Sequence, residues 1–127
     1  DVEAVIKLKE KYPDRVHLTR FERIATHPIV STKQIYEFIG LDFTESIAKF
    51  VYQKTHSNKA GSGYSTDRAD ALEACYKWRK SISYEHAKAF DNFCGESFQK
   101  LGYLPSGSLK NLRNLNNTLL FNTDYFS

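Results

Sequence analysis

The densest group of chemically useful side chains lies at residues 64–68, which read YSTDR and follow the glycine-rich stretch GSG at 61–63. The hydroxyls of Ser65 and Thr66 stand beside the guanidinium of Arg68 and beside backbone amides. Proteins bind phosphate and sulfate with such groups. A hydroxyl or a backbone amide donates one hydrogen bond to an anion oxygen, and a guanidinium can donate two parallel hydrogen bonds. The segment therefore predicts an anion-binding loop. The alternative is a solvent-exposed helix entry, in which Ser65 or Thr66 is a cap and Arg68 is solvated.

Signatures of other enzyme classes do not occur in the sequence. There is no glycine-rich phosphate loop, no G-x-S-x-G and no H-E-x-x-H motif. The four histidines are widely separated, and Cys75 and Cys94 permit one disulfide at most. We therefore predict neither a catalytic residue nor a metal site, and we favour buried free thiols. The adjacent Trp78 and Arg79 are a second candidate, and their types predict a core tryptophan beside a solvated arginine.

The composition fits one globular domain. The chain has 127 residues, 41% of them hydrophobic, and includes nine Phe and eight Tyr. The formal charge of +3 is small and evenly spread, so a nucleic-acid partner is not expected. No apolar run approaches the about 20 residues that cross a bilayer. The opening residues resemble the middle of a helix with no cap before it, which predicts that they continue a longer protein.

Hydrophobic spacing predicts the elements that position these groups. An amphipathic helix is expected over residues 2–12, because Pro13 forces its predecessor out of the helical region. Alternation over 16–21 predicts a short strand, and 22–27 is expected to be a polar connection. Helices with capping signals are then expected from Pro28 to Gly40, after Thr44, over about 70–79, and from Ser83 to Gly102.

A lone strand among helices cannot pair its own backbone groups. The most economical fold class is therefore α/β, with this chain as the mostly helical C-terminal part and its strand joining a parallel sheet upstream. Residues 1–104 would belong to that domain. Residues 105–127, rich in Asn, Ser, Leu and Lys, would form a C-terminal tail.

Several segments, taken together and in order, resemble the Golgi carbohydrate 6-O-sulfotransferases. Residues 15–25 are similar to the family's strand and its Arg-Tyr-Glu-Asp-Leu-Ala segment, although Arg23 replaces the acidic residue. The further resemblances are THP at 26–28, TKQIYEFIGL at 32–41, YSTDR at 64–68, KWR at 77–79, LGY at 101–103 and LKN at 109–111. The LKN segment at 109–111 resembles the corresponding segment of the enzymes that sulfate galactose or N-acetylgalactosamine at O6 in keratan and chondroitin chains.

The resemblance implies a P-loop-like fold and the transfer of a sulfuryl group from 3′-phosphoadenosine 5′-phosphosulfate to the 6-hydroxyl of Gal, GalNAc or GlcNAc. The acceptor would be a keratan- or chondroitin-type chain, or an N- or O-glycan. It also implies donor contacts by Tyr64, Ser65, Thr66 and Arg68, no metal, and a place on the lumenal side of the Golgi membrane with an anchor upstream. The phosphosulfate loop and catalytic base would lie upstream too, so the chain alone is expected to be inactive.

The alternative function is a non-catalytic helical module that binds sulfated glycans through Lys and Arg. The acceptor sugar, the oligomeric state and the pairing of the two cysteines stay open at this point. One N-x-[ST] sequon occurs, at residues 116–118, and there a lumenal enzyme could carry a glycan. The alternative at this sequon is an unmodified tail.

Overall fold

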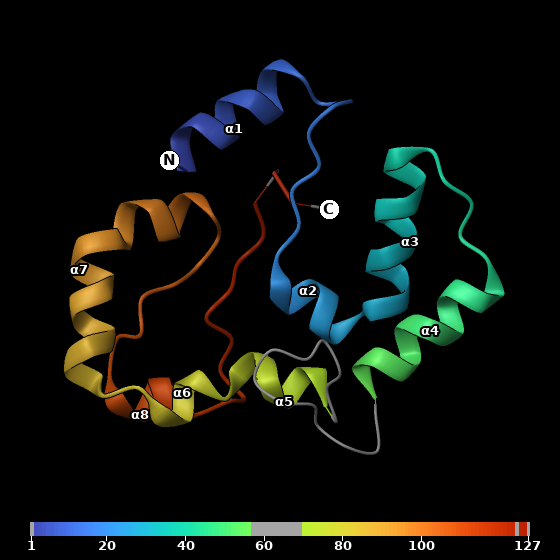
Figure 1. Cartoon of the computed structure of the whole chain (residues 1–127). Helices are drawn as coiled ribbons and strands as arrows, with labels where there is room; N and C mark the ends of the chain where they lie inside the picture. Colours follow the sequence, from blue (N-terminus) through green and yellow to red (C-terminus); the bar gives the residue numbers. More distant parts are fainter. Residues whose placement is uncertain (1, 57–69, 124, 127) are drawn as a thin grey trace. The chain divides into compact units, whose positions relative to one another are not determined.

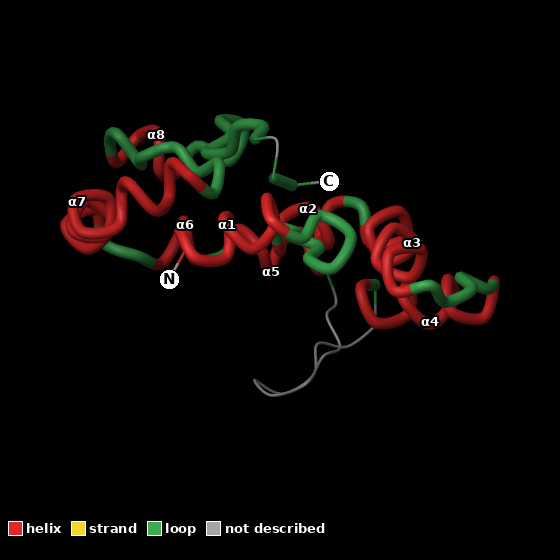
Figure 2. Tube along the Cα trace, turned by 90° about the horizontal axis from the view of Figure 1, so that it is seen from above, coloured by secondary structure: helices red, strands yellow, loops and turns green. Residues whose placement is uncertain are grey.

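The structure is a computed structural model that describes residues 2–56, 70–123, 125 and 126. The chain forms two compact units, one of residues 1–18 with 76–127 and one of residues 19–75 (Figure 1). Among the described residues every regular element is a helix, as Figure 2 shows by its helix and loop colours. The mostly helical character predicted from the sequence is therefore confirmed.

The strand predicted over residues 16–21 does not form in the described part of the chain. Residues 16–20 are irregular, although Arg20 has the extended backbone angles φ −93° and ψ 143°. A strand needs a neighbouring strand to satisfy its donors and acceptors, and residues 16–20 take part in no β-bridge within the described residues. The alternation of residue types is therefore not accompanied by a sheet in this part of the chain.

The unit of residues 19–75 is built from helices joined by short connections. The predicted polar connection over 22–27 is wrong, because Phe21 begins a helix there. His27 ends that helix and precedes the next, and Ser31 Oγ ties the two by donating to the Arg23 carbonyl at 3.1 Å. The helices of this unit are α2 (Phe21–Thr26), α3 (Pro28–Ile39), α4 (Glu45–Thr55) and α5 (Ala71–Tyr76), whose last residue is assigned to the other unit.

Local capping signals predicted several helix ends correctly. Pro28 lies in the first turn of α3, and Gly40 ends that helix with a φ of 73° that favours glycine. Thr44 caps α4, since its Oγ1 accepts a hydrogen bond from the Ile47 amide at 3.4 Å. Ser83 likewise accepts from the His86 amide at 3.2 Å.

The other unit holds α1 and the C-terminal half of the chain. Its core cluster is formed by Ala87, Leu112 and Leu119, with Ile82 and Tyr84 packed against it. The Lys100 ammonium lies 3.0 Å from a Glu96 oxygen and 3.6 Å from a Glu3 oxygen, which links α7 to α1. Helices of this unit are α1 (Val2–Lys11), α6 (Trp78–Ser81), α7 (Tyr84–Lys100) and α8 (Leu109–Arg113).

The helix expected over about 70–79 is broken into α5 and α6 at Lys77. The sequence-based assignment of the adjacent pair is also reversed by the structure. Trp78, expected in the core, is 45% exposed, whereas Arg79, expected in solvent, is only 1% exposed. The reason lies far along the chain, because α8 and the tail fold over the arginine.

The Arg79 guanidinium donates four hydrogen bonds to backbone carbonyls of α8 and the turn after it. Nε donates to Leu112 at 2.9 Å and Nη1 to Asn117 at 3.0 Å, while Nη2 donates to Asn111 at 2.9 Å and Asn114 at 3.0 Å. The last carbonyls of a helix lack partners within it and carry partial negative charge. We call this set of contacts the Arg79 clamp.

A second arginine reaches in the opposite direction. Arg113, at the end of α8, donates through Nη1 to the carbonyl of Arg79 and through Nη2 to the carbonyl of Ile82 at 2.6 Å. The carbonyls at the end of each short helix therefore accept hydrogen bonds from an arginine of the other helix. Burial lowers the pKa of Arg79, against the effect of Tyr76, but an arginine guanidinium stays charged at neutral pH.

We expect Arg79→Ala to destabilise the chain by on the order of 3–5 kcal/mol, because it removes the donor from one buried and three partly buried carbonyls. Arg79→Lys should restore only part of this loss, since an ammonium cannot serve the same four acceptors as a fork. The measurement is urea denaturation followed by circular dichroism. Lys80→Ala, an exposed neighbour on α6, is the control. A clamp variant as stable as this control would contradict the prediction.

Candidate functional site

The predicted anion-binding loop, Tyr64, Ser65, Thr66 and Arg68, lies outside the described residues. The described structure does, however, show what caps the helix that follows it. Oδ1 of Asp70 accepts from the amides of Leu72 at 2.8 Å and Glu73 at 3.0 Å. Asp70 is thus the N-cap of α5. Both the anion-binding loop and the alternative in which Ser65 or Thr66 is a cap concern residues outside the described ones, so both remain predictions.

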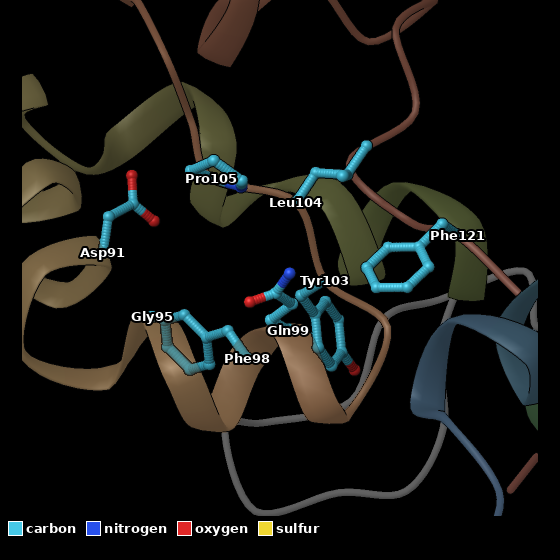
Figure 3. Close-up of a pocket in the computed structure, with 8 residues that line it drawn as sticks. All are labelled: Asp91, Gly95, Phe98, Gln99, Tyr103, Leu104, Pro105 and Phe121. Atoms are coloured by element: carbon cyan, nitrogen blue, oxygen red, sulfur yellow. The ribbon is translucent and has the colours of Figure 1, made fainter. Parts of the chain in front are cut away.

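A pocket of about 540 Å³ lies between α7 and the segment after it (Figure 3). The residues that α7 contributes follow one another at spacings of four, three and one, so they share one face of the helix. The opposite wall comes from the chain after Gly102 and from the tail. The lining residues are Asp91, Gly95, Phe98, Gln99, Tyr103, Leu104, Pro105 and Phe121.

Backbone pairing holds the two non-helical walls together. Gly102, with a φ of 80°, turns the chain out of α7. The Leu104 amide then donates to the Leu119 carbonyl at 2.8 Å, and the Phe121 amide donates to the Gly102 carbonyl at 2.9 Å. This isolated antiparallel bridge brings Phe121 to the pocket. The sequence predicts a helix from Ser83 that stops at Gly102, but no local sequence signal predicts the bridge.

A buried polar network fixes the edge of the pocket near Asp91. Oδ2 of Asp91 accepts from the Ser106 amide at 2.9 Å and from its Oγ at 2.5 Å. The Ser106 carbonyl in turn accepts from Asn111 Nδ2 at 2.9 Å. The backbone carbonyl of Asn111 also accepts a hydrogen bond from Arg79 Nη2 as part of the Arg79 clamp. The clamp is therefore connected to the pocket wall through two hydrogen-bonded residues.

The lining predicts the kind of ligand that the pocket could take. Phe98 and Tyr103 meet edge to face, with ring centroids 6.3 Å apart, and Phe121 adds a third ring. The Gln99 amide lies among the side chains drawn in Figure 3. No Lys or Arg lines the pocket, and Asp91 would repel an anion. The arrangement suits a neutral ligand that has an apolar face and hydroxyl groups.

Other reactive groups do not assemble around this pocket. Both cysteines are free thiols, and burial, with a smaller contribution from Glu22, raises the pKa of Cys75 to about 11. Among the described residues, no three His, Cys, Asp or Glu side chains are grouped as a metal site would require. None of the described helices is long and apolar enough to cross a membrane.

Arg23 stands where the sequence pattern of the 6-O-sulfotransferases described above has an acidic residue. It is a half-buried residue of α2. Its Nε is buried and has no hydrogen-bond partner within the described part of the chain. The charge reversal therefore leaves a donor unused in this unit.

Comparison with known proteins places the chain in a family. Residues 1–102 match the sulfotransferase domain. The chain is 32% identical over 120 residues to carbohydrate sulfotransferase 4 of Mus musculus, an alignment that covers 94% of this chain and 31% of that protein. It is 33% identical over 109 residues to carbohydrate sulfotransferase 1 of Mus musculus, covering 84% of this chain and 25% of that protein. No solved structure matches the chain.

A human relative matches the chain with similar identity and coverage. Carbohydrate sulfotransferase 6 of Homo sapiens is 29% identical over 104 residues, which are 80% of this chain and 26% of that protein. The chain thus spans between a quarter and a third of the length of these relatives. Since the domain match covers well over half of this sequence, the chain belongs to the sulfotransferase family.

Proposed function

We propose that the chain is part of a carbohydrate 6-O-sulfotransferase, which transfers a sulfuryl group from 3′-phosphoadenosine 5′-phosphosulfate to the 6-hydroxyl of Gal, GalNAc or GlcNAc in a glycan. The observation that carries this proposal is the domain match over residues 1–102 together with similarity to carbohydrate sulfotransferases over most of the chain. The acceptor oxygen would bond to sulfur while the bond from sulfur to the donor phosphate breaks. Adenosine 3′,5′-bisphosphate leaves, and a base outside this chain takes the hydroxyl proton.

The extended segment before α2 supports a place in a larger α/β domain. Arg20 already has strand-like backbone angles, and residues 16–20 are irregular without a partner strand. We propose that this segment joins a parallel sheet formed by other parts of a complete sulfotransferase domain. The same proposal puts the enzyme on the lumenal side of the Golgi membrane, with the anchor outside this chain.

The donor contacts are proposed for Tyr64, Ser65, Thr66 and Arg68. Sulfuryl transfer, like phosphoryl transfer, depends on positioned cations and donors around a spread negative charge. A guanidinium and two hydroxyls on one short segment suit that requirement. The start of α5 is capped by Asp70, whose Oδ1 accepts from the amides of Leu72 and Glu73. No metal is needed for these contacts.

The acceptor is proposed to contact the pocket beside α7. A sugar ring offers apolar C–H groups to aromatic rings and hydroxyls to amide and carboxylate groups, which matches Phe98, Tyr103 and Gln99. The anionic donor would find no cation in this pocket. The pocket therefore supports a role on the acceptor side of the reaction.

The proposal predicts that the purified 127-residue chain will not transfer sulfate, whereas a chimera will. In the chimera, the chain replaces the matching segment of carbohydrate sulfotransferase 4 of Mus musculus. Transfer of radiolabelled sulfate from the donor to a glycan acceptor is the measurement. A folded but inactive chimera that still binds sulfated glycans would instead favour the non-catalytic module. Sulfate transfer by the 127-residue chain alone would show that no phosphosulfate loop or catalytic base from outside the chain is needed.

In that chimera, Arg68→Ala should raise the donor KM roughly ten- to a hundred-fold, because one charge-assisted contact is worth on the order of 1.5–3 kcal/mol. The acceptor KM should stay unchanged. Arg68→Lys should recover part of the loss. Lys80→Ala removes an exposed cation elsewhere and serves as the control. An unchanged donor KM in folded Arg68→Ala would favour a solvated arginine.

The acceptor pocket gives the opposite kinetic pattern. Gln99→Ala should raise the acceptor KM about five- to ten-fold, the cost of one neutral hydrogen bond of about 1 kcal/mol, and leave the donor KM unchanged. Asn92→Ala removes an exposed amide from the same helix outside the pocket and is the matched control. Equal effects of the two substitutions on acceptor KM would exclude a specific acceptor contact by Gln99.

A further inference from the structure

Four asparagines lie in α8 and the turn after it, and their side chains differ in the hydrogen bonds that they make. Asn111 Nδ2 donates to the Ser106 carbonyl at 2.9 Å, and Asn117 Nδ2 donates to Asn111 Oδ1 at 2.9 Å. Asn114 Oδ1 accepts from the amide of Asn116 at 3.1 Å. Three of these side chains therefore stabilise the turn, and Asn116 contributes only its backbone.

The side chain of Asn116 is exposed, and within the described residues it makes no hydrogen bond. The backbone on both sides is nevertheless fixed, because the Arg79 clamp holds the carbonyls of Asn114 and Asn117 at 3.0 Å each. Thr118 completes the sequon, and its Oγ1 accepts from the Leu120 amide at 3.1 Å. An ordered turn thus presents one unengaged amide to solvent.

We propose that Asn116 is a site of N-linked glycosylation. The co-substrate would be a lipid-linked oligosaccharide of the secretory pathway, so the inference rests on the lumenal location in the proposed function. Nδ2 of Asn116 forms a bond to the anomeric carbon of the first sugar. The bond from that carbon to the lipid diphosphate oxygen breaks, the diphosphate leaves, and Nδ2 loses one proton.

Of the four asparagines, only Asn116 both begins a sequon and has an exposed side chain that makes no hydrogen bond in the described part of the chain. A glycan is bulky and hydrated, so it needs a side chain that faces solvent. Attachment to Asn117 would remove a donor from Asn111 and crowd the carbonyl that Arg79 holds. Attachment to Asn116 breaks no described side-chain contact, and the glycan would cover solvent-exposed residues of the tail.

The test is expression of the full 127-residue chain behind a secretory leader in cultured human cells. We expect the intact mass to exceed the chain mass by one N-linked glycan and to fall after treatment with peptide N-glycosidase. Asn116→Gln and Thr118→Ala should each abolish the shift. Asn122→Gln, a change at another exposed tail asparagine that is outside a sequon, should retain it.

Cell-free translation with microsomes gives a second measurement that does not require the variant or the native chain to be secreted. Unmodified native chain inside microsomes, or a shift that persists in Asn116→Gln, would overturn the inference. Neither readout depends on sulfate transfer. A glycosylated chain in an inactive chimera would therefore contradict the proposed function alone, and an active chimera with an unmodified Asn116 would contradict this inference alone.

Discussion

Burying a guanidinium is costly unless its N–H groups find acceptors, and four of the five N–H groups of Arg79 donate to backbone carbonyls. The acceptors are concentrated where α8 ends, so the cation also faces the negative end of a helix. A five-residue helix has little stability of its own. The clamp, with Leu112 fully buried beside it, supplies the tertiary contacts that hold α8 in place.

The order imposed by the clamp extends to both features to which we assign a role. Through Asn111 and Ser106 it reaches Asp91 at the edge of the pocket. Through the carbonyl of Asn117 it fixes the turn that exposes Asn116. An interaction that is purely structural can therefore set the geometry of a ligand pocket and of a modification site. Neither feature lies within the segment that the sequence singled out for anion binding.

Features of the fold that depend on neighbouring residues could be predicted from the sequence. Thr44 and Ser83 cap helices, and Gly40 and Gly102 end them, because each acts within about one turn of its own position. The short helix α2 was missed, since its six residues are too few for a periodic pattern. The family was accessible because several motifs occur in order, although each of them is weak alone.

Features that depend on distant residues could not be predicted in this way. Arg79 is buried by carbonyls more than thirty positions away, so residue type favoured the wrong environment. The predicted strand over 16–21 forms no β-bridge in the described chain, and only Arg20 is known to have extended backbone angles. The pocket needs Phe121 brought beside Phe98 by an isolated bridge, which leaves no periodic signal. The proposed donor residues remain a sequence prediction.

Side-chain NMR of Arg79 in arginine-labelled protein tests the role of the clamp most directly. If its Nε and Nη protons are bonded to buried carbonyls, they should exchange slowly at neutral pH and lose protection together with the amides of residues 111–117 as urea is added. Arg15, which is exposed, provides the fast-exchanging reference in the same spectrum. Exchange of Arg79 as fast as that of Arg15, with the tail amides still protected, would contradict the clamp as the interaction that orders the tail.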